Sequence, residues 1–343
     1  MEAEVSYISN PNFSSLVERL ALEANLFVLR YVNYELHYQR FQSGEDGIVC
    51  DGVRAVEPLK SFFFKVKEPV ARYPAPVSQE MGETRAAVII GAKACDLRSL
   101  EILDRVFIED GIKDPFYSAS RQKTTIISCD CSQPKGTCFC TSLNLNPYPE
   151  TGFDLNISRL SEGFIVETGS EKGRNIVEEN SSLFSLPTDS QIEERGRNRS
   201  KTLQEVRGNN EAFSSKKSYR QILNGGLESH IWDRLARECL GCGACTIICP
   251  TCHCFLLYDQ KENEGFERVK EWDFCYFPGF ARVAGRGNPR PRLSDRFKNR
   301  YIKKFDFFQE NFGIDACTGC GRCIEVCLAE IDIRKVFQEL EIT

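Results

Sequence analysis

The first 40 residues of the chain contain two different patterns, one typical of a helix and one typical of a strand. In residues 15–27 apolar residues recur every three or four positions, which predicts an amphipathic helix. Residues 28–40 are rich in β-branched and aromatic side chains, which predicts a strand. A proline-rich stretch follows, at Pro69, Pro74 and Pro76. Because proline fixes φ and lacks a backbone N–H, we interpret this stretch as a loop.

A β-α-β unit is the clearest pattern of the N-terminal half. Residues 85–90 (RAAVII) are typical of a buried strand, the GAKAC sequence after it makes a tight loop, and a helix is predicted from its N-cap, Asp96, to Phe107. Residues 123–128 (KTTIIS) form the second strand of the unit. We expect the two strands to be parallel neighbours joined by a right-handed crossover. Short apolar runs between residues 151 and 177 are interpreted as the last strands of an α/β domain.

The second half of the chain is predicted to be helical and to form a separate domain. Residues 191–217 are polar, mixed in charge and poor in aromatic residues, so we expect an exposed linker or long loop there. This segment divides an α/β domain over residues 1–190 from an α-helical domain over residues 218–343. Helical patterns recur in the second domain, over residues 229–238, 295–312 and 332–340. Gly313 is placed to end the middle helix.

Composition narrows the class of protein. The chain has 343 residues, of which 41% are hydrophobic, enough to bury a core in each of two domains. Its net charge of −5 gives no electrostatic reason to expect nucleic acid, and its three histidines nearly exclude histidine-based catalysis. Its 17 cysteines fit a reducing compartment in which thiols serve as ligands rather than as disulfides. The N-terminus lacks a signal-peptide pattern and no apolar run is long enough to span a membrane, so we expect a cytoplasmic protein.

The cysteines concentrate in two runs that share one spacing. The first run reads CLGCGACTIIC and the second reads CTGCGRCIEVC, so both follow C-x2-C-x2-C-x3-C. This is the thiolate spacing of two-cluster bacterial ferredoxins, in which the fourth cysteine of each run ligates the other cluster. Glycines within the runs let the backbone wrap closely around a cubane. The alternatives are zinc and structural thiols, but zinc sites use separated pairs or cysteine–histidine mixtures, and burial alone needs no such spacing.

Crossed ligation predicts two [4Fe-4S] clusters. The first cluster is expected on Cys239, Cys242, Cys245 and Cys327. The second cluster is expected on Cys317, Cys320, Cys323 and Cys249. Leu328 replaces the proline that commonly follows the last cysteine; that proline supplies no ligand, so the assignment is unchanged. The long insertion between the runs contains a helix and favours an α-helical ferredoxin-like domain over a small β-hairpin ferredoxin.

A third set of thiols is expected at the edge of the α/β sheet. Cys95 and Cys129 each follow a strand of the β-α-β unit, at the carboxyl edge where open α/β sheets bind ligands. Cys138 and Cys140 lie shortly afterwards, in a loop that can fold back to this edge. A third [4Fe-4S] cluster would use these four thiols, with Cys131 as a competitor for one position. A zinc site or free thiols are the alternatives.

Taken together, the motifs resemble a known family. Five segments of the chain resemble the iron–sulfur beta subunit of cytosolic sulfhydrogenases, and they equally resemble the A subunit of anaerobic sulfite reductase. These segments are GAKACDLRSLEILDRVF, CFC, CLGCGACTIICPTCHCF, WDFCYFPGF and CTGCGRC. The resemblance covers about residues 85–142 and 232–330. It implies an electron-transfer subunit between a flavin subunit, which takes electrons from a nicotinamide cofactor, and a catalytic redox partner. It also implies that the four N-terminal thiols belong to the shared motif, and it leaves the role of Cys275 open.

The leading hypothesis for function is an electron relay without bond chemistry of its own. The chain has no G-x-G-x-x-G or Walker lysine motif and no recognisable catalytic set of Ser, His and Asp. A hydrogenase, a sulfite reductase or a heterodisulfide-reductase-like enzyme could be the catalytic partner. A second hypothesis is a flavin- or substrate-binding reductase with its active site near Cys95, and a third is a structural adaptor with zinc at the N-terminal thiols. Cys252, Cys254 and Cys275 are left over, and two roles are open for them: lining the clusters, or replacing one of the assigned ligands.

Overall fold

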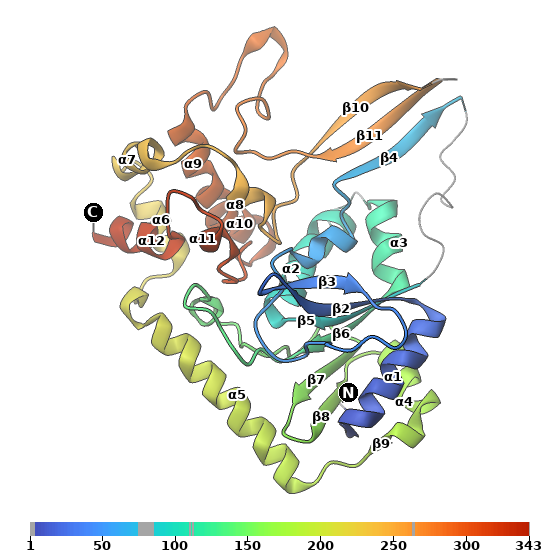
Figure 1. Ribbon diagram of the computed structural model, residues 1–343. Helices are drawn as coiled ribbons and strands as arrows, with labels where there is room; N and C mark the ends of the chain where they lie inside the picture. The colour runs from blue at the N-terminus through green and yellow to red at the C-terminus, as the bar shows by residue number, and fades with distance from the viewer. Residues whose placement is uncertain (1–3, 75–85, 110, 112, 263–264, 343) are drawn as a thin grey trace.

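The computed structural model describes residues 4–74, 86–109, 111, 113–262 and 265–342. The N-terminal half is built on an eight-stranded mixed sheet (Figure 1). The strand order across this sheet is β3-β2-β5-β6-β7-β8-β1-β9. The strands are β1 Val5–Ser9, β2 Asn25–Val32, β3 Glu35–Arg40, β5 Ala87–Ala92, β6 Thr124–Cys129, β7 Leu155–Arg159, β8 Gly163–Thr168 and β9 Phe184–Ser185.

The central strands of the sheet confirm the predicted parallel pairing. β2, β5, β6 and β7 are parallel neighbours, and helices α2 (Ala94–Asp104) and α3 (Pro115–Lys123) connect β5 to β6. The prediction that Asp96 is the N-cap is wrong, because Lys93 holds that position. Asp96 lies in the first turn and accepts a hydrogen bond from the Lys93 backbone N–H at 3.2 Å. The helix therefore begins earlier than predicted, and Cys95 lies in its first turn.

Helices cover both faces of the sheet. On one face α1 (Asn10–Glu23) packs through buried residues such as Leu16 onto the central strands, beside α4 (Glu171–Glu179). On the other face α2 and α3 contribute Leu100 and Tyr117 to a second apolar core. Each such fully buried side chain stabilises the fold by roughly 1.5–3 kcal/mol. The two cores hold the carboxyl ends of the parallel strands in place.

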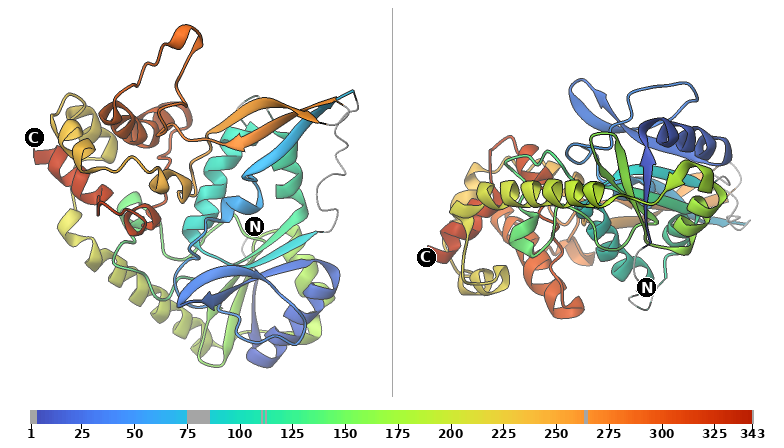
Figure 2. Two further views of the ribbon diagram at one scale, coloured as in Figure 1. Left: turned by 45° about the horizontal axis from the view of Figure 1, so that its top comes forward. Right: turned by 90° about the horizontal axis from the view of Figure 1, so that it is seen from below.

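A second sheet of three antiparallel strands projects from the main body (Figure 2). Its order is β10-β11-β4, with strands β10 Phe255–Glu262, β11 Gly265–Trp272 and β4 Lys67–Tyr73. The prediction of a loop around the prolines is therefore wrong at Pro69, which lies within β4. The strand accommodates Pro69 because β4 lies at the edge of the sheet, and the ladder is irregular between Arg268 and Val269 of the neighbouring strand. Pro74 follows β4, and Pro76 falls outside the described residues.

A long helix, α5 (Asp189–Asn209), occupies most of the segment expected to be a linker or long loop. It runs along one side of the molecule from the main sheet to the C-terminal helices (Figures 1 and 2). A capping box at Thr188 starts the helix. Ion pairs hold it to the sheet, among them Arg199 to Asp130 at 2.7 Å. Few of its side chains are buried, Val206 among them, so its apolar period is too weak to show in the sequence.

Helices dominate the C-terminal part. They are α6 Tyr219–Gly225, α7 Ile231–Glu238, α8 Ala244–Ile247, α9 Leu293–Ile302, α10 Phe308–Phe312, α11 Arg322–Glu325 and α12 Ile333–Ile342. A π-helical segment, Lys303–Phe307, joins α9 to α10, and Gly313 ends this stretch in the left-handed conformation, as predicted. Trp232, Tyr301 and Phe337 belong to the aromatic core of this part. Across the described ranges, no helix combines the length and the apolar character needed to cross a membrane.

Candidate functional site

Four cysteines expected to hold one cluster surround a small pocket in the C-terminal part. We call it the C-terminal thiol pocket, and its cysteines are Cys249, Cys317, Cys320 and Cys323. Cys249 comes from the first cysteine run and the other three come from the second, as crossed ligation requires. Gly319 and Gly321 have φ values of +62° and +75°, which L side chains rarely adopt, so glycine lets the loop curve around the pocket.

A buried lysine is fixed against this pocket. The Nζ of Lys304 donates hydrogen bonds to Cys249 Sγ at 3.2 Å and to Thr251 Oγ1 at 2.8 Å. A third hydrogen bond reaches the Ala316 carbonyl at 3.1 Å. Burial alone would lower the pKa of Lys304, but the nearby cysteine sulfurs outweigh burial and raise that pKa, so the side chain stays positively charged. Nothing in the spacing of the motif pointed to this lysine.

The first cysteine run faces the last cysteine of the second run. Cys239 and Cys327 are electrostatic neighbours of the Cys245 thiol. The Gly241 backbone N–H donates to Cys239 Sγ at 3.4 Å. Three of the four thiols expected for the first cluster therefore lie near one another, and the fourth, Cys242, is exposed.

Arg300 connects the two C-terminal sets of thiols electrostatically. Its guanidinium lines the C-terminal thiol pocket and is buried, with 7% of the residue exposed. Burial would lower the pKa of Arg300, but Cys245 and Cys323 outweigh it and raise that pKa. Cys245 belongs to the first expected ligand set and Cys323 to the second, so one buried cation interacts electrostatically with both sets.

The N-terminal thiols line a second small pocket. We call it the N-terminal thiol pocket, and its motif cysteines are Cys95, Cys131, Cys138 and Cys140. Cys95 is positioned by α2, and the other three lie in the loop that follows β6. Three of these four were expected together, and Cys131 was the competitor for the fourth place. The edge of the parallel sheet thus gathers thiols, as its topology predicts.

The structure does not place Cys129 in the N-terminal thiol pocket. Cys129 is still part of β6, where it pairs with Ile157. Its side chain is fully buried in the core beneath α1 and is hydrogen-bonded to Cys50. Cys131 is the next cysteine and lies beyond the strand, in the loop that turns toward the pocket. The difference arises because the strand ends after Cys129 rather than before it.

The thiols of each pocket surround a space rather than a point. In the part of the chain that the structure describes, no three His, Cys, Asp or Glu side chains are arranged to hold a single metal ion. A mononuclear zinc site needs its ligands within about 2.3 Å of one ion. A cubane spreads its ligands over four irons, so its thiols lie farther apart. The all-cysteine donor set of each pocket is the one that [4Fe-4S] clusters use.

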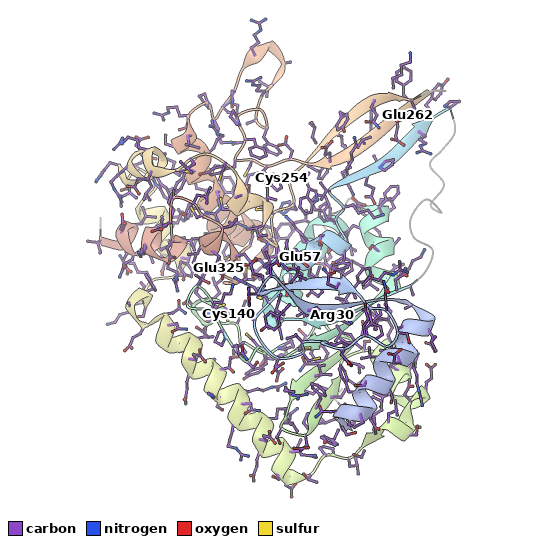
Figure 3. All side chains as sticks on the ribbon, viewed as in Figure 1. Arg30, Glu57, Cys140, Cys254, Glu262 and Glu325 are labelled. Atoms are coloured by element: carbon purple, nitrogen blue, oxygen red, sulfur yellow. The ribbon has the colours of Figure 1, made fainter. Side chains whose placement is uncertain are left out.

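The two thiol pockets share a wall. Cys320 lines both of them. Across this wall the Phe139 backbone N–H donates to the Gly319 carbonyl at 2.7 Å. A Cβ on Gly319 would lie 2.5 Å from the Cys140 backbone, so only glycine permits this approach. Figure 3 shows Cys140 and Glu325 at this junction between the N-terminal loop and the C-terminal helices.

Comparisons with known proteins agree with this geometry. A family model described as a 4Fe-4S dicluster domain matches residues 238–331, which contain both cysteine runs. Over 300 residues the chain is 35% identical to sulfhydrogenase 2 subunit beta of Pyrococcus furiosus, a match that covers 86% of each protein. The chain belongs to the sulfhydrogenase beta-subunit family. It is an iron–sulfur electron-transfer subunit with [4Fe-4S] clusters.

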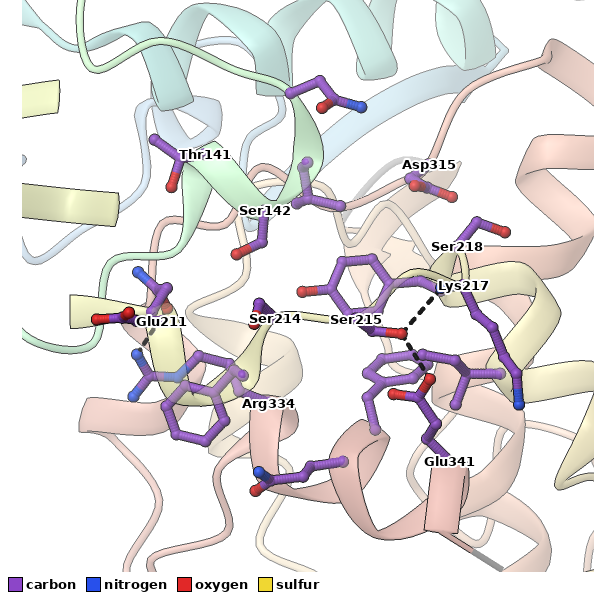
Figure 4. A pocket seen from close by; sticks show the side chains of 18 of the residues that line it. Thr141, Ser142, Glu211, Ser214, Ser215, Lys217, Ser218, Asp315, Arg334 and Glu341 are labelled. Carbon is purple, nitrogen blue, oxygen red and sulfur yellow. Dashed lines mark hydrogen bonds between the residues drawn. The ribbon is translucent and has the colours of Figure 1, made fainter. Parts of the chain in front are cut away.

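A polar pocket of about 490 Å³ lies next to the segments that carry Cys140 and Cys317, and Thr141 and Asp315 are among its lining residues. Figure 4 shows Ser215 within it, hydrogen-bonded to Glu341 and to the Lys217 backbone N–H. Three cations and three carboxylates line it: Arg207, Lys217, Arg334, Glu211, Asp315 and Glu341. Because these charges balance, the polar pocket shows no preference for an anionic or a cationic ligand.

Three cysteines of the C-terminal half, Cys252, Cys254 and Cys275, belong to none of the expected ligand sets and line neither thiol pocket. Cys252 lies beside the C-terminal thiol pocket, where its thiol is hydrogen-bonded to Cys249 and its carbonyl accepts from Lys60 Nζ at 2.9 Å. Cys254 and Cys275 are hydrogen-bonded to each other farther along the chain. The sequence left open whether these three line the clusters or replace an assigned ligand.

Proposed function

We propose that the chain holds three [4Fe-4S] clusters and relays electrons between a flavin subunit that reacts with NAD(P)H and a catalytic redox subunit. The observation that carries this proposal is the wall shared by the two thiol pockets. Because Cys320 lines both pockets, clusters bound in them would be separated by a single ligand loop. Electron transfer through protein requires such short separations. The chain would thus connect its N-terminal and C-terminal clusters by direct packing.

The proposed ligands follow the motif spacing for the first cluster and the two thiol pockets for the second and third. The first cluster takes Cys239, Cys242, Cys245 and Cys327. The second cluster takes Cys317, Cys320, Cys323 and Cys249. The third cluster takes Cys95, Cys131, Cys138 and Cys140, with Cys131 in place of the predicted Cys129. The α-helical ferredoxin-like character of the C-terminal part is included in the proposal, since α8 and α11 begin within the two ligand loops.

When bound, [4Fe-4S] clusters supply reversible one-electron chemistry. The residues around each cluster set its reduction potential. Lys304 and Arg300 hold buried positive charge next to the ligand sulfurs of the second cluster. The backbone N–H groups of Gly241 and Ile331 donate to Cys239 and Cys327 sulfurs of the first, each at 3.4 Å. Positive charge and N–H donors both stabilise the more negative, reduced state.

The surface supports association with other subunits. Cys242 is exposed, so the first cluster would lie nearest to a redox partner. The edge strand β10 also exposes Leu256 and Leu257, at 51% and 50%. Exposed apolar residues on an unpaired edge are typical of surfaces that bind other chains. The catalytic partner could be a hydrogenase, a sulfite reductase or a heterodisulfide-reductase-like enzyme, and a cytoplasmic location is part of this proposal.

Iron and acid-labile sulfide per chain, measured on protein purified without oxygen, test the proposal. A flavin assay is made on the same sample. Three cubanes predict about twelve irons and no flavin. About eight irons would contradict the third cluster and leave the other two. Stoichiometric flavin on the isolated chain would contradict a dedicated relay.

The second candidate function is a flavin- or substrate-binding reductase with its site near Cys95. The N-terminal thiol pocket beside Cys95 measures about 30 Å³. Small-molecule sites occupy roughly 300–1,000 Å³, so an isoalloxazine ring does not fit there. An inorganic core bonded directly to the lining sulfurs needs less room, because bonds replace van der Waals contacts. The pocket therefore favours the relay.

A further inference from the structure

The β10–β11 hairpin closes on two cysteines that line neither thiol pocket. Cys254 immediately precedes β10, and Cys275 follows β11. The last pair in the strand register is Phe255 opposite Trp272, and the Asp273 backbone N–H donates to the Cys254 carbonyl at 3.2 Å. The hydrogen bonding of the hairpin therefore continues to Cys254 and holds its backbone beside the segment that carries Cys275.

The side chains of these two cysteines are in direct contact. Their thiols are hydrogen-bonded to each other, and the Cys275 backbone N–H also donates to the Cys254 sulfur. Disulfide formation requires close backbones and facing side chains. The hairpin holds the two backbones close together, and the hydrogen bond between the thiols shows that the two side chains face each other. The pair therefore meets both of these conditions for a bridge.

The two thiols differ in environment. Cys254 is half-buried, whereas Cys275 is buried with 7% exposed. The hydrogen bond from Cys275, aided by the charge of Lys303, outweighs burial and lowers the pKa of Cys254 to about 6. The same hydrogen bond and burial raise the pKa of Cys275. A reachable thiolate beside a protonated second thiol is the arrangement of a nucleophilic and a resolving cysteine.

We propose that Cys254 and Cys275 form a thiol–disulfide exchange site separate from the electron relay. The Cys254 thiolate attacks one sulfur of a small-molecule disulfide, whose S–S bond breaks and releases one thiolate. Cys275 then gives its proton to that thiolate and attacks the Cys254 sulfur of the mixed disulfide, which releases the second thiolate. Two protein thiols are oxidised to one disulfide, and one small disulfide is reduced to two thiols.

The test uses the full chain, purified without oxygen and exposed to glutathione disulfide as the probe. After quenching with N-ethylmaleimide, tryptic peptides are analysed by mass spectrometry. Cleavage after Lys270 and Arg282 gives a peptide over residues 271–282 whose one cysteine is Cys275. The expected product links this peptide to Cys254 while the iron content of the protein stays unchanged. Both cysteines alkylated separately after exposure would overturn the proposal.

Two single variants separate the proposed roles. In Cys275→Ser the mixed disulfide cannot resolve, so glutathione should remain attached at Cys254. In Cys254→Ser the buried Cys275 should acquire no glutathione. Loss of iron in either variant would show instead that these cysteines are cluster ligands, and that would also overturn the proposal.

The chain contains an internal control for selectivity. Cys50 and Cys129 are also hydrogen-bonded to each other but lie in the core of the main sheet, with 6% and 0% exposed. The exchange mechanism requires access to the attacking sulfur. Cys50 and Cys129 should therefore stay reduced under conditions that link Cys254 to Cys275. Equal oxidation of both pairs would contradict a dedicated exchange site.

Discussion

Arg322 and Asp96 form an ion pair that is closed to solvent and joins the two halves of the chain. Their Nη2 and Oδ1 atoms are 2.9 Å apart, and the side chains are 1% and 0% exposed. Asp96 directly follows Cys95, and Arg322 lies between Cys320 and Cys323. One buried ion pair thus links a ligand segment of the proposed third cluster to the ligand loop of the second.

Replacing Asp96 with Asn should destabilise the protein strongly. The variant keeps the size of the side chain but leaves the Arg322 charge buried without its partner. Breaking one side of a buried ion pair costs about 3–5 kcal/mol. Denaturant unfolding of the protein under anaerobic conditions measures the loss.

A matched control lies on the same helix. Arg98 and Glu101 form an ion pair whose side chains are 24% and 45% exposed. Water screens this pair, so Glu101→Gln should cost no more than about 1 kcal/mol. Equal losses of stability in the Asp96 and Glu101 variants would show that the buried pair has no special role.

The third cluster gives a prediction that distinguishes neighbouring cysteines. Cys131→Ala should remove one cubane, about four of about twelve irons per chain, because Cys131 lines the N-terminal thiol pocket. Cys129→Ala should keep all the iron, because Cys129 faces the core beside Cys50. Iron analysis together with electron paramagnetic resonance of the reduced protein checks both. The reverse result would restore the ligand set expected from sequence.

This pair of cysteines also shows how far sequence reasoning reaches. The spacing of the two runs predicted which thiols share the C-terminal thiol pocket, because ligand spacing is a local property of the chain. The β-α-β pattern predicted the edge where Cys95 and its partners meet. It could not choose between Cys129 and Cys131, because that choice depends on the residue at which β6 ends, and strand ends are poorly marked in sequence.

Long-range contacts were the other part that sequence could not supply. Lys304 reaches Cys249 from a helix 55 positions away, and no motif marks it. Helix α5 was missed because ion pairs to the sheet, rather than an apolar face, hold it in place. Pro69 was taken for a loop residue because sequence does not show that β4 is an edge strand. Each miss depends on a partner that lies far away along the chain.

Gly319 and Gly241 should differ sharply when replaced by alanine. Both glycines lie in ligand loops with nearly the same φ, +62° and +66°, so both variants suffer about 1–2 kcal/mol of backbone strain. An alanine Cβ at position 319 would also lie 2.5 Å from the Cys140 backbone, whereas at position 241 its nearest contacts are Leu293 side-chain atoms at 3.7 Å. Gly319→Ala should therefore reduce the iron content and Gly241→Ala should keep it. Comparable iron in the two variants would argue against tight packing between the thiol pockets.

Lys304 should set the reduction potential of the second cluster. Replacing it with Met removes a buried positive charge from the Cys249 sulfur, so adding an electron becomes less favourable and the potential becomes more negative. The expected shift is on the order of 100 mV, from the interaction of unit charges a few ångströms apart. A redox titration followed by electron paramagnetic resonance measures it. Lys303→Met is the control, since Lys303 is partly exposed and lies over the Phe280 ring; an equal shift there would mean that general charge, not this contact, matters.

The reactivity of Cys254 should change with pH in a way that its environment dictates. With a pKa of about 6, its thiolate fraction rises between pH 5 and 7, so the alkylation rate should reach half its maximum near pH 6. An ordinary cysteine reaches that point at about pH 8.5. Cys275→Ala removes the side-chain donor that stabilises the thiolate, so the midpoint should move to higher pH. Timed iodoacetamide labelling, with Cys254 quantified by mass spectrometry, gives both profiles. A midpoint that stays in place in Cys275→Ala would mean that the charge of Lys303, rather than the paired thiol, holds Cys254 ionised.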